Sequence, residues 1–354
     1  MKRFILYAAV FTLVFSSCRK DPSDFVNTPD PEPPGKYDNG FFIVNEGWYG
    51  HGPGTLSFYS YETQSLTDSI YQVENPGKEF SASTSSLQWA KFHGGKLFLM
   101  VKVDGDVVVL DGKTMKETTR ISGHDWRDFA AIDEQTALLS AGDGIYPLDL
   151  ETLAAGSRIA GVDEEVNDLL VAGNYVFAST SSGVVALNKS GYTLAKKFEN
   201  MDTAPVLTDD GSVWAAKNDT LFRIKTDLST EAVPLGFSVR SNMSFALSQI
   251  TAGGNAVYLV ADNNYASPNN KIYKYVPGEA ASLTTAFVTS IPESRNVYNR
   301  GIGFDKAKNQ LDITTVGADY GPGNTTYIFD AANGNLVKSI EREGYYFPSM
   351  PLYR

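Results

Sequence analysis

The chain has 354 residues, a formal net charge of −11 and an isoelectric point near 4.8. An acidic surface disfavours nucleic acid as a partner, because binding to it depends on Lys and Arg neutralising phosphates. Residues 37–354 are enough for one large domain or two ordinary ones, and no second apolar run there approaches the length of a membrane span.

The N-terminus has the pattern of an export signal. Lys2 and Arg3 precede the apolar run Phe4–Phe15, which is too short to span a bilayer permanently. Ser16 and Ser17 then lead into Cys18, an arrangement that resembles a bacterial lipobox. We predict a lipoprotein signal peptide over residues 1–17 and lipidation of Cys18. The alternative is a plain signal peptide followed by an accidental cysteine.

Two features favour the lipid anchor. Cys18 is the only cysteine, so it cannot form an intramolecular disulfide. Residues 18–36 are rich in Asp and Pro, with too little apolar surface to fold, and are expected to be a flexible tether. Arg19–Asp21 resembles the charged signals that follow the cysteine in Bacteroidetes surface lipoproteins. These features predict a protein held on the outer membrane by its lipid alone and exposed at the cell surface.

After the tether, a repeat of short strands organises the chain. The clearest unit has strands at Leu87–Phe92, Lys96–Val101, Val107–Asp111 and Lys116–Ile121, named A to D in order. The second and third strands of this unit recur in five further copies. These pairs are 137–140 with 144–149, 175–179 with 183–188, 212–216 with 220–225, 256–260 with 271–275, and 310–315 with 326–330.

A further unit is split between the two ends of the domain. Phe41–Glu46, Thr55–Ser60 and Leu66–Tyr71 supply strands B, C and D, and Tyr346–Tyr353 can supply the missing A strand. Such an offset closes a ring and leaves no sheet edge open. We therefore predict an all-β fold over residues 37–354: a seven-bladed β-propeller closed by the C-terminal strand, which completes the first blade. Two stacked sandwiches, the alternative, do not explain the missing first strand.

Two segments of this domain resemble a known family. Phe42–Gly47 followed by Gly54–Tyr59 resembles the opening of Bacteroidetes lipoprotein propellers related to the YncE-like and "surface layer protein" propellers. Val109–Thr118 matches their usual turn between blade strands. Some members of that family are surface-exposed proteins that bind cobalamin (vitamin B12). The resemblance implies binding of cobalamin or related corrinoids, as a bound ligand rather than a cofactor, and transfer to a TonB-dependent outer-membrane transporter.

The loops independently point to one face of the propeller. A–B and C–D turns lie on one face and are short, whereas B–C and D–A connections lie on the other and carry large rings. Rings with polar tips on loops suit a sizeable amphipathic ligand or a protein partner, although some could pack under their own loops. The residues expected to bind ligand are Trp48, Tyr49, His51, Phe80, Trp126, Phe237, Tyr265, Tyr298, Arg300, Tyr320, Tyr345 and Tyr346.

Metal and catalytic chemistry find little support in the sequence. His51 and His124 fall on the same face and could coordinate the cobalt of a corrinoid, but either could equally be a solvated loop histidine. We found no histidine–carboxylate cluster with metal-ligand spacing, and we expect no catalytic residues and no protein-bound metal. The alternatives to corrinoid capture are a propeller scaffold that binds a protein or glycan partner and, since propellers also host hydrolases and lyases, an enzyme.

Overall fold

A computed structural model describes residues 35–242, 247–261, 271–292, 295–317 and 319–354. They belong to one compact unit, Gly35–Arg354. The predicted signal peptide, Cys18 and almost all of the predicted tether lie outside the described residues. No helix in the described ranges is long and apolar enough to cross a membrane.

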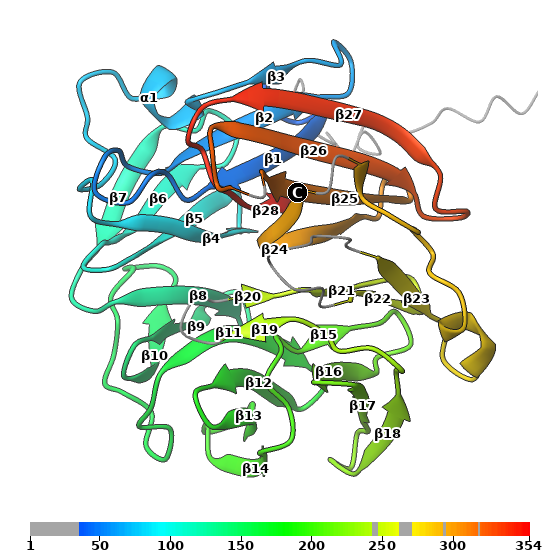
Figure 1. Ribbon diagram of the computed structural model, residues 1–354. Helices are drawn as coiled ribbons and strands as arrows, with labels where there is room; N and C mark the ends of the chain where they lie inside the picture. Colours follow the sequence, from blue (N-terminus) through cyan, green and yellow to red (C-terminus); the bar gives the residue numbers. More distant parts are fainter. Residues whose placement is uncertain (1–34, 243–246, 262–270, 293–294, 318) are drawn as a thin grey trace, which may run out of the picture. The chain divides into compact units, whose positions relative to one another are not determined.

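The unit is a seven-bladed β-propeller, so the predicted fold class is confirmed (Figure 1). Five blades are four-stranded antiparallel sheets. Their strands, from the innermost outward, are β28 (Pro348–Leu352), β1 (Gly40–Asn45), β2 (Thr55–Ser60) and β3 (Leu66–Thr67) in blade 1; β4 (Ser86–His93), β5 (Lys96–Lys102), β6 (Val107–Asp111) and β7 (Glu117–Ile121) in blade 2; β11 (Val166–Ala172), β12 (Tyr175–Thr180), β13 (Gly183–Asn188) and β14 (Leu194–Phe198) in blade 4; β15 (Val206–Leu207), β16 (Val213–Lys217), β17 (Thr220–Ile224) and β18 (Thr230–Pro234) in blade 5; and β24 (Asn296–Asp305), β25 (Gln310–Val316), β26 (Gly323–Asp330) and β27 (Leu336–Glu343) in blade 7.

The other two blades have three-stranded sheets, where the repeat predicted four strands. Blade 3 has β8 (Trp126–Ala131), β9 (Thr136–Ala141) and β10 (Gly144–Asp149), and blade 6 has β21 (Ile250–Gly253), β22 (Ala256–Val260) and β23 (Ile272–Tyr275), preceded by the pair β19 (Ser241–Asn242) and β20 (Leu247–Ser248). Single bridges, Leu148↔Ala155 and Ile272↔Val288, stand where the outer strands would be. In blade 3 the third strand contains Pro147, which has no N–H to donate to a fourth strand.

Two short helices in the described residues interrupt the all-β pattern. The predicted strand Leu66–Tyr71 ends at Thr67, because Ser69 adopts a left-handed conformation with φ of 57° and the helix α1 (Ile70–Glu74) follows. Ile70 and Tyr71 of this helix are fully buried, and their packing holds a helix too short to be stable alone. A 3-10 helix, η3 (Ala280–Leu283), follows β23.

The apolar core consists of seven clusters, one at each interface between neighbouring blades. Between blades 2 and 3, for example, the rings of Phe98 and Phe129 stack with centroids 4.3 Å apart. Each blade packs between two neighbouring blades, so its inner strands are buried on both faces. The strand β5 (Lys96–Lys102) is therefore an almost unbroken apolar run. The outermost strand β27 alternates between exposed and half-buried residues instead.

The predicted closure by the C-terminal strand is confirmed. β28 pairs antiparallel with β1, with Phe42 opposite Leu352 and Val44 opposite Met350. Beyond the strand ends, the N–H of Glu46 donates to the carbonyl of Phe347 (2.9 Å) and that of Gly47 donates to Tyr346 (3.0 Å). The first and last segments of the domain are thus joined by one ladder, which has a register shift between Val44 and Asn45.

The seam where blade 7 meets blade 1 has the smallest of the seven apolar clusters. Its cluster has four buried apolar residues, and two carboxylates lie beside it. The Tyr353 hydroxyl donates to Asp312 Oδ2 (2.8 Å), and the Tyr61 hydroxyl bonds to Asp305. Asp312 Oδ1 has no hydrogen-bond partner among the described residues. Burial and the nearby Asp305 raise the pKa of Asp312 to about 7, although the bond from Tyr353 opposes the shift.

This shift predicts a pH-dependent seam. Asp312 stays protonated in the folded protein up to about pH 7 but ionises near pH 4 in the unfolded chain, so stability should fall as the pH rises between these values. Asp312→Asn removes the ionisation. From pH 5 to pH 8, the free energy of unfolding of the variant should rise by roughly 1–4 kcal/mol relative to that of the wild type, measured by denaturant unfolding at both pH values. The same difference in free energy of unfolding at pH 5 and at pH 8 would contradict the prediction.

Candidate functional site

Three exposed rings form a stack on blade 1, which we call the ring stack: His51, Trp48 and Tyr345. Trp48 lies 3.8 Å from His51 and 4.1 Å from Tyr345 between ring centroids, with interplanar angles of 24° and 22°. Trp48 and Tyr345 are 40% and 41% exposed, and Tyr49 in the same loop is 55% exposed. Of the large hydrophobic side chains that are exposed among the described residues, only Trp48, Tyr49 and Tyr345 are aromatic.

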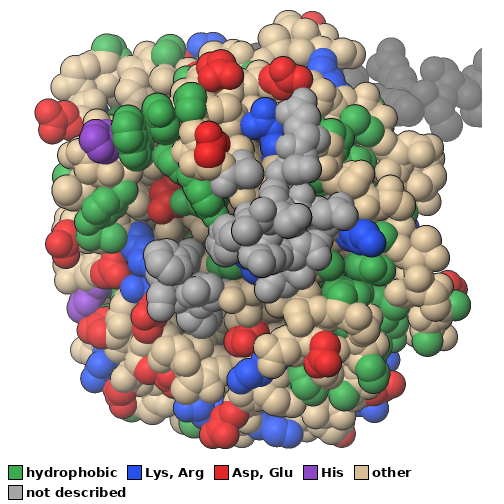
Figure 2. Space-filling model, in the orientation of Figure 1, with side chains coloured by type: hydrophobic (Ala, Val, Ile, Leu, Met, Phe, Trp, Pro, Cys, Tyr) green, Lys and Arg blue, Asp and Glu red, His purple; other side chains and the backbone are tan. Residues whose placement is uncertain are grey.

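Two loops from opposite ends of the chain build this stack. Trp48 and His51 lie between β1 and β2, and Tyr345 lies between β27 and β28. The first loop is a tight turn, in which the N–H groups of His51 and Gly52 both donate to the Trp48 carbonyl. Gly47 has a φ of 82°, and a Cβ there would lie 2.6 Å from the backbone of Pro53, so only glycine permits this turn. Figure 2 shows hydrophobic side chains gathered over this part of the face.

Beside the ring stack lies a hollow of about 370 Å³, which we call the blade 1 hollow. Trp48, His51, Tyr345 and Tyr346 form its aromatic side. Its polar side comes from β1, β2 and α1: Asn45, Thr55, Ser69 and Gln72. A platform of rings beside several hydrogen-bonding side chains is the typical lining of a small-molecule site.

An ion pair between the buried side chain of Arg342 and the half-buried Asp68 supports the hollow. Arg342 of β27 donates to Asp68 (2.8 Å), to the Ser57 hydroxyl (2.7 Å) and to the Asn45 side-chain oxygen (2.7 Å). Its guanidinium also lies 4.0 Å from the centroid of the Tyr346 ring. Burial lowers the pKa of Arg342, and Asp68 opposes this effect. Arg342 therefore holds Asn45 and Tyr346 in place and ties blade 7 to blade 1.

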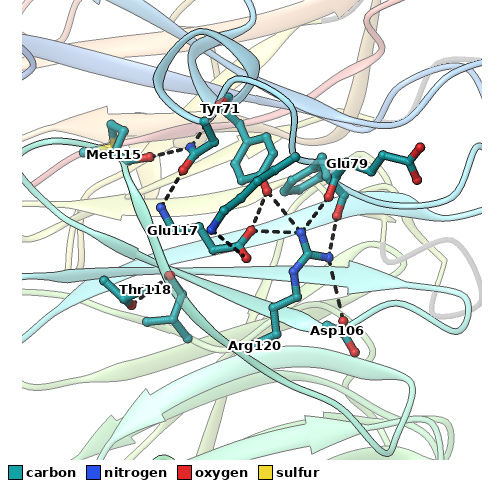
Figure 3. A network of polar contacts seen from close by, with 11 residues as sticks. Tyr71, Glu79, Asp106, Met115, Glu117, Thr118 and Arg120 are labelled. Atoms are coloured by element: carbon teal, nitrogen blue, oxygen red, sulfur yellow. Dashed lines mark hydrogen bonds and ion pairs between the residues drawn. The ribbon is translucent and has the colours of Figure 1, made fainter.

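A second network holds α1, and with it Gln72, against blade 2 (Figure 3). Arg120 donates to Glu117 (2.9 Å), to the Tyr71 hydroxyl (3.1 Å) and to the Glu79 carbonyl (2.7 Å). The Tyr71 hydroxyl also bonds to Glu117. Burial alone would raise the pKa of Glu117, but the hydrogen bonds from Arg120 and Tyr71 lower it to about 2.

A row of ring contacts leads from the ring stack towards blade 7. Tyr345 lies 6.4 Å from Phe347, Phe347 lies 5.7 Å from Tyr298, and Tyr298 lies 6.4 Å from Tyr320 between centroids. The Tyr298 hydroxyl donates to Glu46 Oε2 (2.8 Å), which raises the pKa of Tyr298 together with burial. Burial likewise raises the pKa of Glu46, which also accepts hydrogen bonds from Gln88 and Asn299.

The structure thus brings together one part of the predicted set. Trp48, Tyr49, His51, Tyr345 and Tyr346 share the surface of blade 1, and Tyr298 and Tyr320 continue it through Phe347. Sequence reasoning missed Phe347, Gln72 and Arg342. Phe347 and Arg342 come near the loop through ring closure, and Gln72 lies in the helix α1, where the pattern predicted no helix.

Other predicted residues lie elsewhere. Phe80 and Trp126 were wrong as ligand contacts, because both are core residues, 2% and 0% exposed. Phe80 packs on Tyr71, and Trp126 packs on Tyr146. Phe237 is half-buried and stacks on Tyr273 at 4.0 Å. Arg300 lies on β24 and lines a cavity between the innermost strands of the blades, and Tyr265 is outside the described residues.

The two histidines of this face occupy different surroundings. His51 belongs to the ring stack, whereas His124 contacts Tyr146 at 4.1 Å and has its Nδ1 3.7 Å from Asp143. Within the described part of the chain, no group of three or more His, Cys, Asp or Glu side chains is placed to hold a metal ion.

Comparisons with known proteins agree with the fold. The family model described as "Domain of unknown function (DUF5074)" matches residues 39–354. No curated protein matches the sequence. A quinonprotein alcohol dehydrogenase-like protein from Bacteroides thetaiotaomicron has a TM-score of 0.73 and 20% identity, over 90% of this chain and 78% of that one.

Two further solved structures are more distant. A putative 6-phosphogluconolactonase from Bacteroides fragilis has a TM-score of 0.58 and 13% identity, over 90% of this chain and 99% of that one. Virginiamycin B lyase from Staphylococcus aureus has a TM-score of 0.51 and 13% identity, over 73% of this chain and 84% of that one. At such identities these likenesses show that the propeller fold is shared, and they say nothing about chemistry.

The network in Figure 3 yields a prediction about stability. Because the folded pKa of Glu117 is depressed to about 2, its contribution is complete above the unfolded value near 4.5 and is lost as the pH falls from there to about 2. Glu117→Gln should destabilise the protein by about 1–3 kcal/mol at pH 7, and by progressively less below pH 4.5. Urea unfolding of both proteins across this range measures the difference; an equal loss at pH 3 and pH 7 would argue against the assignment.

Proposed function

Because the chain belongs to DUF5074, a family whose description assigns no activity, we propose its function from the site itself: a non-catalytic propeller that captures a flat, amphipathic ligand on blade 1. The observation that carries this proposal is the ring stack. Exposed aromatic rings clustered at one place on a monomer's surface are characteristic of interaction sites. Here Trp48 is held between loops by two stacked neighbours, so little side-chain freedom would be lost on binding.

The ligand that we propose is a corrinoid, such as cobalamin. This choice comes from the resemblance of Phe42–Gly47 and Val109–Thr118 to the lipoprotein propellers described above. The geometry is compatible with it. Because His51 and Tyr345 cover the two faces of Trp48, a macrocycle with a flat face and amide arms would pack on an outer ring of the stack while an arm enters the hollow, where Gln72 and Ser69 offer hydrogen bonds.

Cell-surface capture completes the proposal. Acylated Cys18 would hold the propeller on the outer membrane through residues 18–36, and a TonB-dependent transporter would receive the corrinoid. The lipid anchor is tested by metabolic labelling with a fatty acid, which Cys18→Ala should abolish.

A glycan is the second candidate. The polar side of the hollow, with Asn45, Thr55, Ser69 and Gln72 beside aromatic rings, could also pair with sugar hydroxyls. A sugar would need only the hollow and the adjacent ring, whereas a corrinoid should also depend on the row that continues through Tyr298 and Tyr320.

The decisive experiment is titration with cyanocobalamin, followed by calorimetry or by quenching of tryptophan fluorescence. We expect binding at micromolar concentration or tighter, and at least about tenfold weaker binding for both ring variants, because Tyr345→Ala removes an outer ring of the stack and Trp48→Ala removes the ring that holds the stack together. Leu336→Ala is the matched control: it removes a side chain that is 46% exposed on the outer strand β27 and should leave affinity unchanged.

Two results would overturn this proposal. Absence of cyanocobalamin binding at micromolar ligand would contradict the proposed ligand. Unchanged affinity in both ring variants would contradict the proposed location of the site. A panel of neutral oligosaccharides in the same titration distinguishes the second candidate, since binding that is lost in Trp48→Ala would then identify a glycan.

A further inference from the structure

A second cavity runs along the propeller axis, and the proposed function does not use it. It encloses about 390 Å³ and is lined by the innermost strands of all seven blades, from Lys91 of β4 to Pro351 of β28. A second hollow of about 320 Å³ adjoins it and shares Lys91, Leu169, Leu170 and Tyr353 with it. Together they form what we call the central channel.

The second hollow is the mouth of this channel, on the face opposite the ring stack. Its lining includes His93, Ala131 and Val171, which lie at or next to the ends of β4, β8 and β11 where the A–B turns begin. Most of this lining is apolar, with Phe92, Phe129, Val171 and Leu352 around the opening. From Lys91 to His93 the strand advances by about 7 Å, which is the depth of the mouth.

Four charged side chains line the first cavity, and one of them, Lys91, also lines the mouth. Lys91 Nζ donates to Asp128 Oδ2 (2.8 Å) and to the Leu169 carbonyl (3.1 Å), and Arg300 pairs with Asp168. Arg300 also lies 5.0 Å from the centroid of the Trp89 ring. The four side chains come from blades 2, 3, 4 and 7.

The two carboxylates of this group are fully engaged. Asp128 accepts from the N–H of Phe129 (2.8 Å) and of Leu169 (2.8 Å) in addition to Lys91. Asp168 accepts from the Ser179 hydroxyl (2.6 Å) in addition to its pairing with Arg300. Neither carboxylate therefore needs a further donor from a ligand.

The two cations, in contrast, retain donors. Arg300 Nε is buried and has no hydrogen-bond partner among the described residues. Lys91, which lines the channel, makes two of the three bonds that an ammonium can donate, and its side chain is 35% exposed. The remaining N–H donors of Arg300 and Lys91 require a hydrogen-bond acceptor, and an anionic oxygen is the strongest acceptor for two cations.

We propose that the central channel binds a short-chain monocarboxylate, with its carboxylate between Lys91 and Arg300 and its apolar chain in the mouth. A single negative charge suits the site, because a dianion such as phosphate would also face Asp128 and Asp168. The apolar rings and aliphatic side chains at the mouth match a hydrocarbon chain and not a strongly hydrated ion.

Isothermal titration of the full chain with sodium hexanoate tests this site. We expect saturable binding, weakened about tenfold or more in Lys91→Gln because a charged hydrogen bond is lost while Asp128 keeps its two backbone donors. Ala131→Phe should also abolish binding by filling the mouth without touching the charges. Lys306→Gln is the matched control, since Lys306 pairs with Asp209 outside the channel and is 77% exposed.

Hexanamide and inorganic phosphate complete the titration. Hexanamide should bind much more weakly than hexanoate, because it lacks the charge, and phosphate should not compete. No heat with hexanoate at millimolar concentration, equal affinity for hexanamide, or unchanged affinity in both Lys91→Gln and folded Ala131→Phe would each overturn the proposal. Cyanocobalamin binding should be unaffected in these variants, so the outcome is independent of the function proposed for blade 1.

Discussion

The antiparallel pairing of β28 with β1 is the interaction on which the rest of this molecule depends. It gives blade 1 its innermost strand and removes the open edge that the first and last segments would otherwise present. It also continues past the strands, through the backbone bonds from Glu46 and Gly47 to Phe347 and Tyr346. Two loops about 300 residues apart in sequence thereby come to lie side by side, and the ring stack is a direct product of that closure.

The same closure accounts for the composition of the seam between blades 7 and 1. Six blade interfaces join consecutive segments and are filled by larger apolar clusters, whereas the seam between blades 7 and 1 has the smallest cluster. Polar side chains supply specificity there: Arg342 crosses the seam to Asp68 and Asn45, and Asp312 bonds to Tyr353 at the end of the chain. Buried polar groups of this kind fix a unique pairing at a cost in stability.

How far the sequence could lead differs between the fold and the site. Turn residues and β-branched runs recur at a regular spacing, so the blades and the split first unit could be predicted from local pattern. The short helix α1 could not, because Ser69 and the burial of Ile70 and Tyr71 decide it. Their position in loops was enough to predict Trp48 and Tyr345 as exposed site residues. It was not enough for Phe80 and Trp126, which are buried, because burial depends on neighbouring blades that the pattern does not place. Lys91 and Asp128, charged residues within innermost strands, were the overlooked signal of the central channel.

The central claim is that a ligand binds where the two ends of the ring meet. Hydrogen–deuterium exchange with and without saturating cyanocobalamin tests it most directly, because it reports both loops in one experiment. The account predicts slower exchange in residues 46–54 and 343–347 together, with residues 173–175 and 189–193 on the opposite face of blade 4 unchanged. Protection confined to one of the two loops, or located on another blade, would contradict it.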